Sequence, residues 1–100
     1  MRQVGAIRHY VLLYEVVDNF VAQRAPHRAA HLERVRTATA RGELILAGAL
    51  GDPPTRALLV FRSADRAAAE AFAEADPYVR EGLVRRWEVQ PWAVVVGGAP

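Results

Sequence analysis

Histidine is the side chain best suited to proton transfer near neutral pH, and the chain of 100 residues contains three, His9, His27 and His31. His27 and His31 are four residues apart, so they share a face if that segment is helical. Such a pair is half of a metal site, but a third ligand and a His-Glu-x-x-His pattern are missing. The sequence therefore predicts no metal site, and the simpler interpretation is two imidazoles on a helix surface.

A carboxylate that holds one ring nitrogen of a histidine fixes the tautomer of the ring. Asp76 is the candidate, because it follows an alanine-rich helical pattern and could fold back against an earlier helix. The helix macrodipole opposes a carboxylate at a helix C-terminus, which favours a specific role for Asp76. The alternative is that Asp76 only ends the helix ahead of Pro77.

Three further side chains could bind a ligand. Tyr78 offers an aromatic wall with a hydroxyl group, and Arg24 and Arg28 could hold a substrate carboxylate in bidentate fashion. Each has an ordinary alternative, which is a core position for the tyrosine and, for the arginines, salt bridges to carboxylates such as Glu33 or Glu15.

The composition excludes several classes of protein. The absence of cysteine rules out disulfides, thiolate metal sites and a cysteine nucleophile, and it fits the cytoplasm, which is the predicted location. The net charge of +2, with arginines mixed among acidic residues, predicts no nucleic-acid partner. No apolar run resembles a signal peptide or a membrane span, so no membrane association is predicted. No glycine loop for phosphates is present, and no cofactor is expected.

The chain alternates between strand-like and helix-like patterns. Residues 9–17 are aromatic and β-branched on both faces, which is typical of a strand buried on two sides. A helical segment is predicted from about Asp18, with Pro26 restarting it and Gly42 ending it. The apolar stripe expected on this helix consists of Ala30, Leu32, Val35 and Ala38.

The second half of the chain repeats this alternation. Strands are predicted over residues 43–50, 56–61 and 83–92, with Pro91 bending or ending the last and residues 92–96 forming a short extra strand. Ser63 or Asp65 is expected to cap a helix that ends at Asp76-Pro77.

The order β-α-β-β-α-β is the ferredoxin-like arrangement of the α+β class. We expect a single domain over residues 1–100, with its core at about 9–96. Two helices can cover only one face of a four-stranded sheet, yet the strands at 9–17 and 43–50 are apolar on both faces. The sequence therefore predicts a homodimer whose two sheets pack face to face.

Four segments resemble the YCII-related (YciI-like) family in order and spacing. They are R-A-P-H-R-A-A-H-L (24–32), G-E-L-I-L-A-G (42–48), A-D-P-Y-V-R-E-G-L (75–83) and V-Q-P-W (89–92). The resemblance spans about residues 9–96. It implies a dimeric α+β barrel of ferredoxin-like subunits, with a His-Asp pair at a pocket beside the sheet.

Carried over residue by residue, the resemblance identifies the pair as His31 and Asp76. It gives the two arginines of the helix motif as Arg24 and Arg28, and it leaves His27 without a counterpart, while Tyr78 would line the pocket. We therefore expect His31 and Asp76 to lie about 2.6 to 3.2 Å apart, directly or through a water.

The function implied by the resemblance is that of a cofactor-independent enzyme with lyase, isomerase or dehalogenase-like chemistry. His31 would be the general acid/base and Asp76 would hold its tautomer, while Arg24 and Arg28 would bind the anionic group of a small organic molecule. The alternative is a non-catalytic dimer that binds a small molecule or serves as an accessory subunit.

Overall fold

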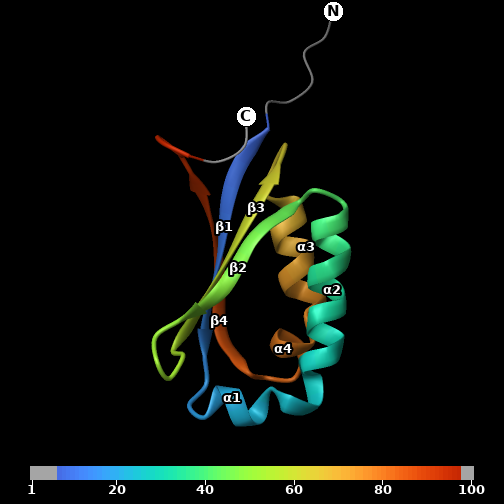
Figure 1. Cartoon of the computed structure of the whole chain (residues 1–100), viewed down its shortest axis with the longest axis vertical. Helices are drawn as coiled ribbons and strands as arrows, with labels where there is room; N and C mark the ends of the chain where they lie inside the picture. The colour runs from blue at the N-terminus through green and yellow to red at the C-terminus, as the bar shows by residue number, and fades with distance from the viewer. Residues whose placement is uncertain (1–6, 98–100) are drawn as a thin grey trace, which may run out of the picture.

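Four strands form one antiparallel sheet in the order β2-β3-β1-β4 in the computed structural model of this chain, which describes residues 7–97 (Figure 1). The strands are β1 (Arg8–Val16), β2 (Leu44–Leu50), β3 (Arg56–Ser63) and β4 (Val84–Trp92). The predicted single domain also includes residues 1–6 and 98–100, which lie outside the described residues.

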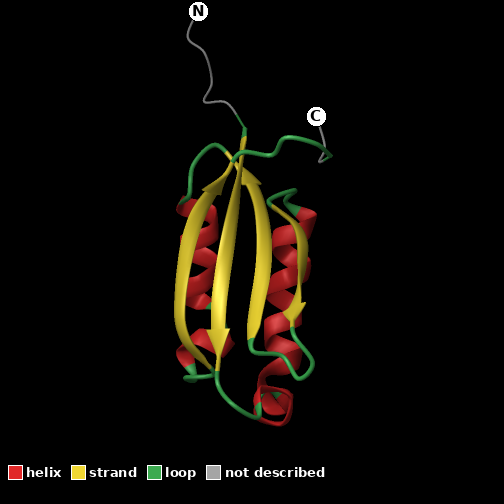
Figure 2. Cartoon of the chain, turned by 90° about the vertical axis from the view of Figure 1, so that its left-hand side faces the viewer, coloured by secondary structure: helices red, strands yellow, loops and turns green. Residues whose placement is uncertain are grey.

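The helices lie on one face of this sheet, as the view turned by 90° shows (Figure 2). They are α1 (Phe20–Gln23), the 3₁₀ turn η1 (Ala25–His27), α2 (Arg28–Ala40), α3 (Ala67–Ala75) and α4 (Pro77–Arg80). The prediction that Ser63 or Asp65 caps the second helix is wrong, because the N-cap of α3 is Arg66 and no side chain caps it. Asp65 lies one residue earlier, where its Oδ1 accepts a hydrogen bond from the backbone N–H of Ala67. The order of elements confirms the α+β class and the βαββαβ arrangement.

The core lies between the sheet and the helices, among which α3 contributes the most buried residues, and it follows the alternation of the strands. Leu12 of β1 stands opposite Leu59 of β3 and Val89 of β4, and all three are buried on the side that faces the helices. The other face of the sheet carries apolar residues that this single chain leaves partly or largely exposed. They are Val11, Leu13, Leu46 and Leu58.

Helix α2 packs against the sheet less closely than its predicted stripe implies. Ala38 is buried and Leu32 and Val35 are half-buried, whereas Ala30 is exposed, so the prediction for Ala30 is wrong. Two residues turn a helix by about 200°, so Ala30 and Leu32 point in opposite directions. The side of α2 near its start instead carries His31 toward the interior.

The two edges of the sheet differ in character. On β4, Pro91 does not end the strand, because it pairs with Tyr10 and the strand continues to Trp92. An edge strand tolerates proline, since the missing N–H can face the free side. The extra strand predicted for residues 92–96 does not form, because β4 takes in Trp92 and residues 93–97 have no regular structure. The other edge, β2, contains neither charge nor proline and exposes 67% of Leu46.

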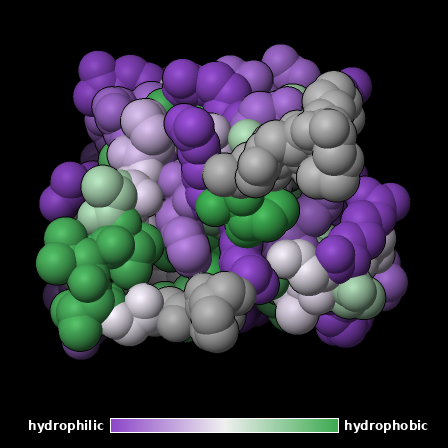
Figure 3. Space-filling model, turned by 90° about the horizontal axis from the view of Figure 1, so that it is seen from above, coloured by the Kyte–Doolittle hydropathy of each residue, from purple (hydrophilic) through white to green (hydrophobic). Residues whose placement is uncertain are grey.

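Exposed hydrophobic side chains also gather where β1 begins and β4 ends. This end of the molecule is seen in Figure 3, where hydrophobic surface lies between hydrophilic regions. Its large exposed residues are Ile7, Trp92, Val95 and Val96. Across residues 7–97, no helix combines the length and the hydropathy needed to span a lipid bilayer.

Candidate active site

Asp76 lies at the junction of α3 and α4, where its backbone is extended with ψ of 126°. Its side chain is fully buried, and Oδ1 accepts a hydrogen bond from the backbone N–H of Tyr78 at 3.1 Å. The carboxylate therefore caps the N-terminus of α4, where a hydrogen-bond acceptor is favoured. The dipole of α3 disfavours a carboxylate at its C-terminus, but the N-terminus of α4 favours one at the same position. The sequence analysis missed α4, although proline at its first position is a known signal of a helix start.

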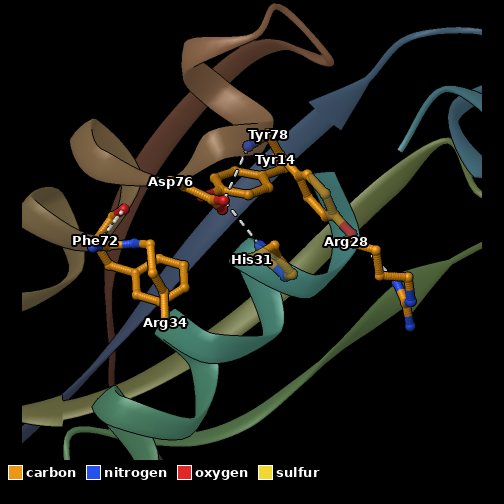
Figure 4. A network of polar contacts seen from close by, with 7 residues as sticks. All are labelled: Tyr14, Arg28, His31, Arg34, Phe72, Asp76 and Tyr78. Atoms are coloured by element: carbon orange, nitrogen blue, oxygen red, sulfur yellow. Dashed lines mark hydrogen bonds and ion pairs between the residues drawn. The ribbon is translucent and has the colours of Figure 1, made fainter. Parts of the chain in front are cut away.

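Two more donors converge on the Asp76 carboxylate (Figure 4). His31 Nδ1 lies 2.9 Å from Oδ1, so the predicted contact between His31 and Asp76 is confirmed. Tyr14, on β1, donates its hydroxyl hydrogen to Oδ2 at 2.6 Å. An ionised carboxylate only accepts hydrogen bonds, and three donors offset the desolvation that burial imposes on its charge.

The proton of Tyr14 stays on the phenol. Burial, and then the neighbouring Asp76 carboxylate, raise the pKa of Tyr14 far above its usual range. Tyr14 is consequently a donor to Asp76 over the whole physiological pH range.

The ring of His31 is held in one orientation. It stacks on Tyr78 with 3.9 Å between ring centroids and an interplanar angle of 11°, and the ring of Phe72 lies edge-on at 6.2 Å. Because Asp76 binds Nδ1, the neutral ring carries its proton there and leaves Nε2 as an acceptor. Nε2 is turned away from Asp76 (Figure 4). The side chain of His31 remains 12% exposed.

His31 borders a pocket of about 350 Å³ between α2 and strands β2 and β3. The space exists because small residues occupy the helix-facing side of the sheet here, with Ala49 opposite Ala57. Farther along the same two strands, Leu44 stands opposite Phe61 and both are buried. The pocket is lined by Tyr14, Phe20, Arg24, Arg28, His31, Leu32, Val35, Ala47, Gly48, Ala49, Ala57, Leu59 and Tyr78.

The two predicted arginines both lie at this pocket. Arg28 Nη1 donates to the hydroxyl of Tyr78 at 3.4 Å, and the guanidinium of Arg24 lies 5.4 Å from the ring centre of Phe20. Neither is ion-paired with a carboxylate of the described residues. The alternative of salt bridges to Glu33 or Glu15 is wrong, because these carboxylates pair with other arginines, Arg36 and Arg86.

Tyr78 forms a wall of the pocket, as expected, and it is buried. His27 lies in η1 and is not among the residues that line the pocket, and His9 lies on the other face of the sheet, opposite Arg62 and Trp92. Within residues 7–97, no group of three or more His, Cys, Asp or Glu side chains could hold a metal ion.

Tyr14 is the residue of this site that the sequence analysis missed. The alternation of β1 already placed it on the same face as Tyr10 and Leu12. A buried tyrosine usually needs a partner for its hydroxyl group. That requirement was the available signal, but no partner could be named without the position of Asp76.

The model of the YCII-related domain family matches residues 9–93 of the chain. The chain belongs to this family. The match confirms the resemblance that the four sequence segments indicated. No curated protein sequence matches the chain significantly.

Two solved structures share the fold of this YCII-related domain. One is 5-chloro-2-hydroxyhydroquinone dehydrochlorinase from Burkholderia phenoliruptrix in complex with 2,5-dihydroxybenzoquinone, with a TM-score of 0.69 and 19% identity over 85% of this chain and 93% of that one. The other, from Bacteroides thetaiotaomicron, is assigned as an antibiotic biosynthesis monooxygenase, with a TM-score of 0.58 and 17% identity over 94% of each chain. At such identities the likeness establishes the fold.

Proposed function

We propose that this YCII-related domain is a cofactor-independent enzyme that moves a proton on a small anionic organic molecule. His31 is the general base, Asp76 holds its tautomer, and Arg24 and Arg28 bind the anionic group of the substrate. The observation that carries the proposal is the arrangement of His31, whose Nδ1 is bound by a buried carboxylate while its ring borders a pocket.

The geometry supports elimination or isomerisation next to a carbonyl or hydroxyl group. Nε2 of His31 accepts a proton from the substrate, and the resulting imidazolium is stabilised by Asp76 at 2.9 Å. The arginines stabilise the negative charge that develops on the substrate oxygen. In an elimination a leaving group departs with the electron pair of its bond to carbon; in an isomerisation the imidazolium returns the proton to another carbon.

Loss of hydrogen chloride is the elimination to test first, because the structurally similar enzyme from Burkholderia is a dehydrochlorinase. In such a reaction the base takes the proton and chloride leaves with the carbon–chlorine bonding electrons. We expect the protein to release chloride from 5-chloro-2-hydroxyhydroquinone faster than heat-denatured protein does, measured under anaerobic conditions. Binding of the related 2,5-dihydroxybenzoquinone without any chloride release would instead support a non-catalytic, small-molecule-binding role.

Neutralising either pocket arginine should weaken binding of an acidic ligand. We expect Arg24→Gln and Arg28→Gln each to raise the Kd for 2,5-dihydroxybenzoquinone by about tenfold, because each removes a charge-assisted hydrogen bond. Titration calorimetry measures this. Arg36→Gln is the matched control, since Arg36 lies on α2 but is exposed and paired with Glu33. Equal affinity of all four proteins would contradict a role for the two arginines in binding.

We also propose that the protein is a homodimer that buries the outer face of the sheet. Large apolar areas are rarely left exposed on monomeric proteins, and this face carries Leu13, Leu46 and Leu58. Light scattering at micromolar concentration should give twice the 11.0 kDa mass of one chain. Leu58→Arg should shift the mass toward that of the monomer, because it would bury an unpaired charge in the interface. A wild-type protein that scatters as a monomer would refute the dimer.

A further inference from the structure

Tyr14 is the member of the buried network to which the proposed function gives no role. It lies on β1, 62 residues from Asp76 in sequence, and only 1% of it is exposed. Its hydroxyl group binds Oδ2 of Asp76, whereas His31 and the backbone N–H of Tyr78 both bind Oδ1. Among the described residues, Tyr14 is therefore the sole hydrogen-bond partner of Oδ2.

This division of the two oxygens matters because the side-chain torsion that rotates a carboxylate has broad minima. Donors on one oxygen alone leave the plane of the carboxylate free to turn about that contact. A donor on the second oxygen, fixed to a central strand of the sheet, sets the plane.

We propose that Tyr14 is a positioning residue for His31 that acts through Asp76. Its hydroxyl group fixes the plane of the carboxylate, so that the proton of the neutral imidazole stays on Nδ1 and Nε2 remains free to accept one. The role rests on the proposed function of His31 as a base. Its first consequence, a single histidine tautomer, exists without any substrate.

Tyr10 provides a matched control on the same strand. It lies on the same face of β1 as Tyr14 and is also buried, with 8% exposed. Its hydroxyl group makes no hydrogen bond to another described residue. Tyr10→Phe therefore removes a buried hydroxyl group from the same strand, as Tyr14→Phe does, but it leaves the hydrogen bonds of Asp76 intact.

The test is nitrogen NMR of protein labelled with ¹⁵N-histidine, at a pH high enough to keep the imidazoles neutral. We expect His31 in the wild type and in Tyr10→Phe to show one tautomer, with the proton on Nδ1. In Tyr14→Phe the ratio of tautomers should fall by about tenfold, as expected when a hydrogen bond to a charged group is lost. A wild-type ratio in Tyr14→Phe would overturn the proposal.

Asp76→Ala separates this failure from that of the proposed function, because it removes the acceptor that holds Nδ1 of His31. If Asp76→Ala leaves the tautomers of His31 unchanged, the pairing of His31 with Asp76 fails, and the role of Tyr14 falls with it. If Asp76→Ala alters the ratio and Tyr14→Phe does not, only the role of Tyr14 is refuted. The wild-type protein alone offers a further test by proton NMR. The hydroxyl proton of Tyr14, held in the hydrogen bond to Asp76, should give a resolved downfield signal. Absence of that signal would also contradict the proposal.

Discussion

Replacing Asp76 with alanine is expected to lower the free energy of unfolding by about 3 kcal/mol, because three donors would lose their acceptor inside the protein. These donors are the hydroxyl group of Tyr14, Nδ1 of His31 and the backbone N–H of Tyr78. The loss is a large fraction of the roughly 5–15 kcal/mol typical of a native domain. For a chain of this length it corresponds to a fall in Tm of roughly 12–24 °C. Thermal unfolding followed by circular dichroism, at one protein concentration, measures it.

Asp76→Asn is the matched variant for this measurement. Its amide oxygen can accept from His31 and Tyr78, while its NH₂ group faces the hydroxyl oxygen of Tyr14, which can accept in turn. We therefore expect the asparagine variant to lose only about 1 kcal/mol. If the alanine variant melts within about 2 °C of the wild type, the hydrogen bonds of Asp76 do not stabilise the fold.

Replacing His31 with asparagine is expected to reduce chloride release by about a hundredfold or more while leaving the protein folded. The amide nitrogen of asparagine occupies nearly the position of Nδ1, so the hydrogen bond to Asp76 can be kept. No group then replaces Nε2 as an acceptor for the proton of the substrate. Initial rates of chloride release, together with the Tm of the variant, test both halves of this expectation.

His27→Asn is the control for this substitution. His27 lies one helical turn before His31 but is not part of the pocket. Full activity is expected for this variant. Normal turnover by His31→Asn would reject His31 as the base and would leave the non-catalytic, small-molecule-binding dimer as the remaining interpretation.

The helices and strands could be predicted because two signals agree along most of the sequence. They are the period of the hydrophobic residues and the positions of the glycines and prolines that begin or end elements. The strand predicted over residues 9–17 forms as β1 (Arg8–Val16), and Gly42 and Gly82, both with positive φ, mark the turns into β2 and β4. The stripe of α2 was less well predicted. Periodicity assumes that the buried face of a helix is apolar, and at this pocket the buried face carries His31.

The contact between His31 and Asp76 was predicted from the family resemblance and from the unfavourable position of a carboxylate after a helix. Neither of these signals could identify Tyr14, the third side chain of the network. Tyr14 looks like any core residue of a strand, and only the tertiary structure shows that its hydroxyl group meets Asp76. Short helices such as α4 are also hard to predict, because a segment of four residues has no hydrophobic period.

The unequal edges of the sheet have a consequence for assembly into fibres. An uncovered strand edge is a template on which another chain can add, and endless growth requires such a template on both sides of every molecule. The β2 edge meets this requirement, since it is apolar, uncharged and free of proline. The β4 edge contains Pro91, which has no N–H to donate, and it also carries Arg85, Arg86 and Glu88. If chains added edge to edge through β2, the addition would therefore end after two chains, because Pro91 and the charged residues make the β4 edge a poor template for a third.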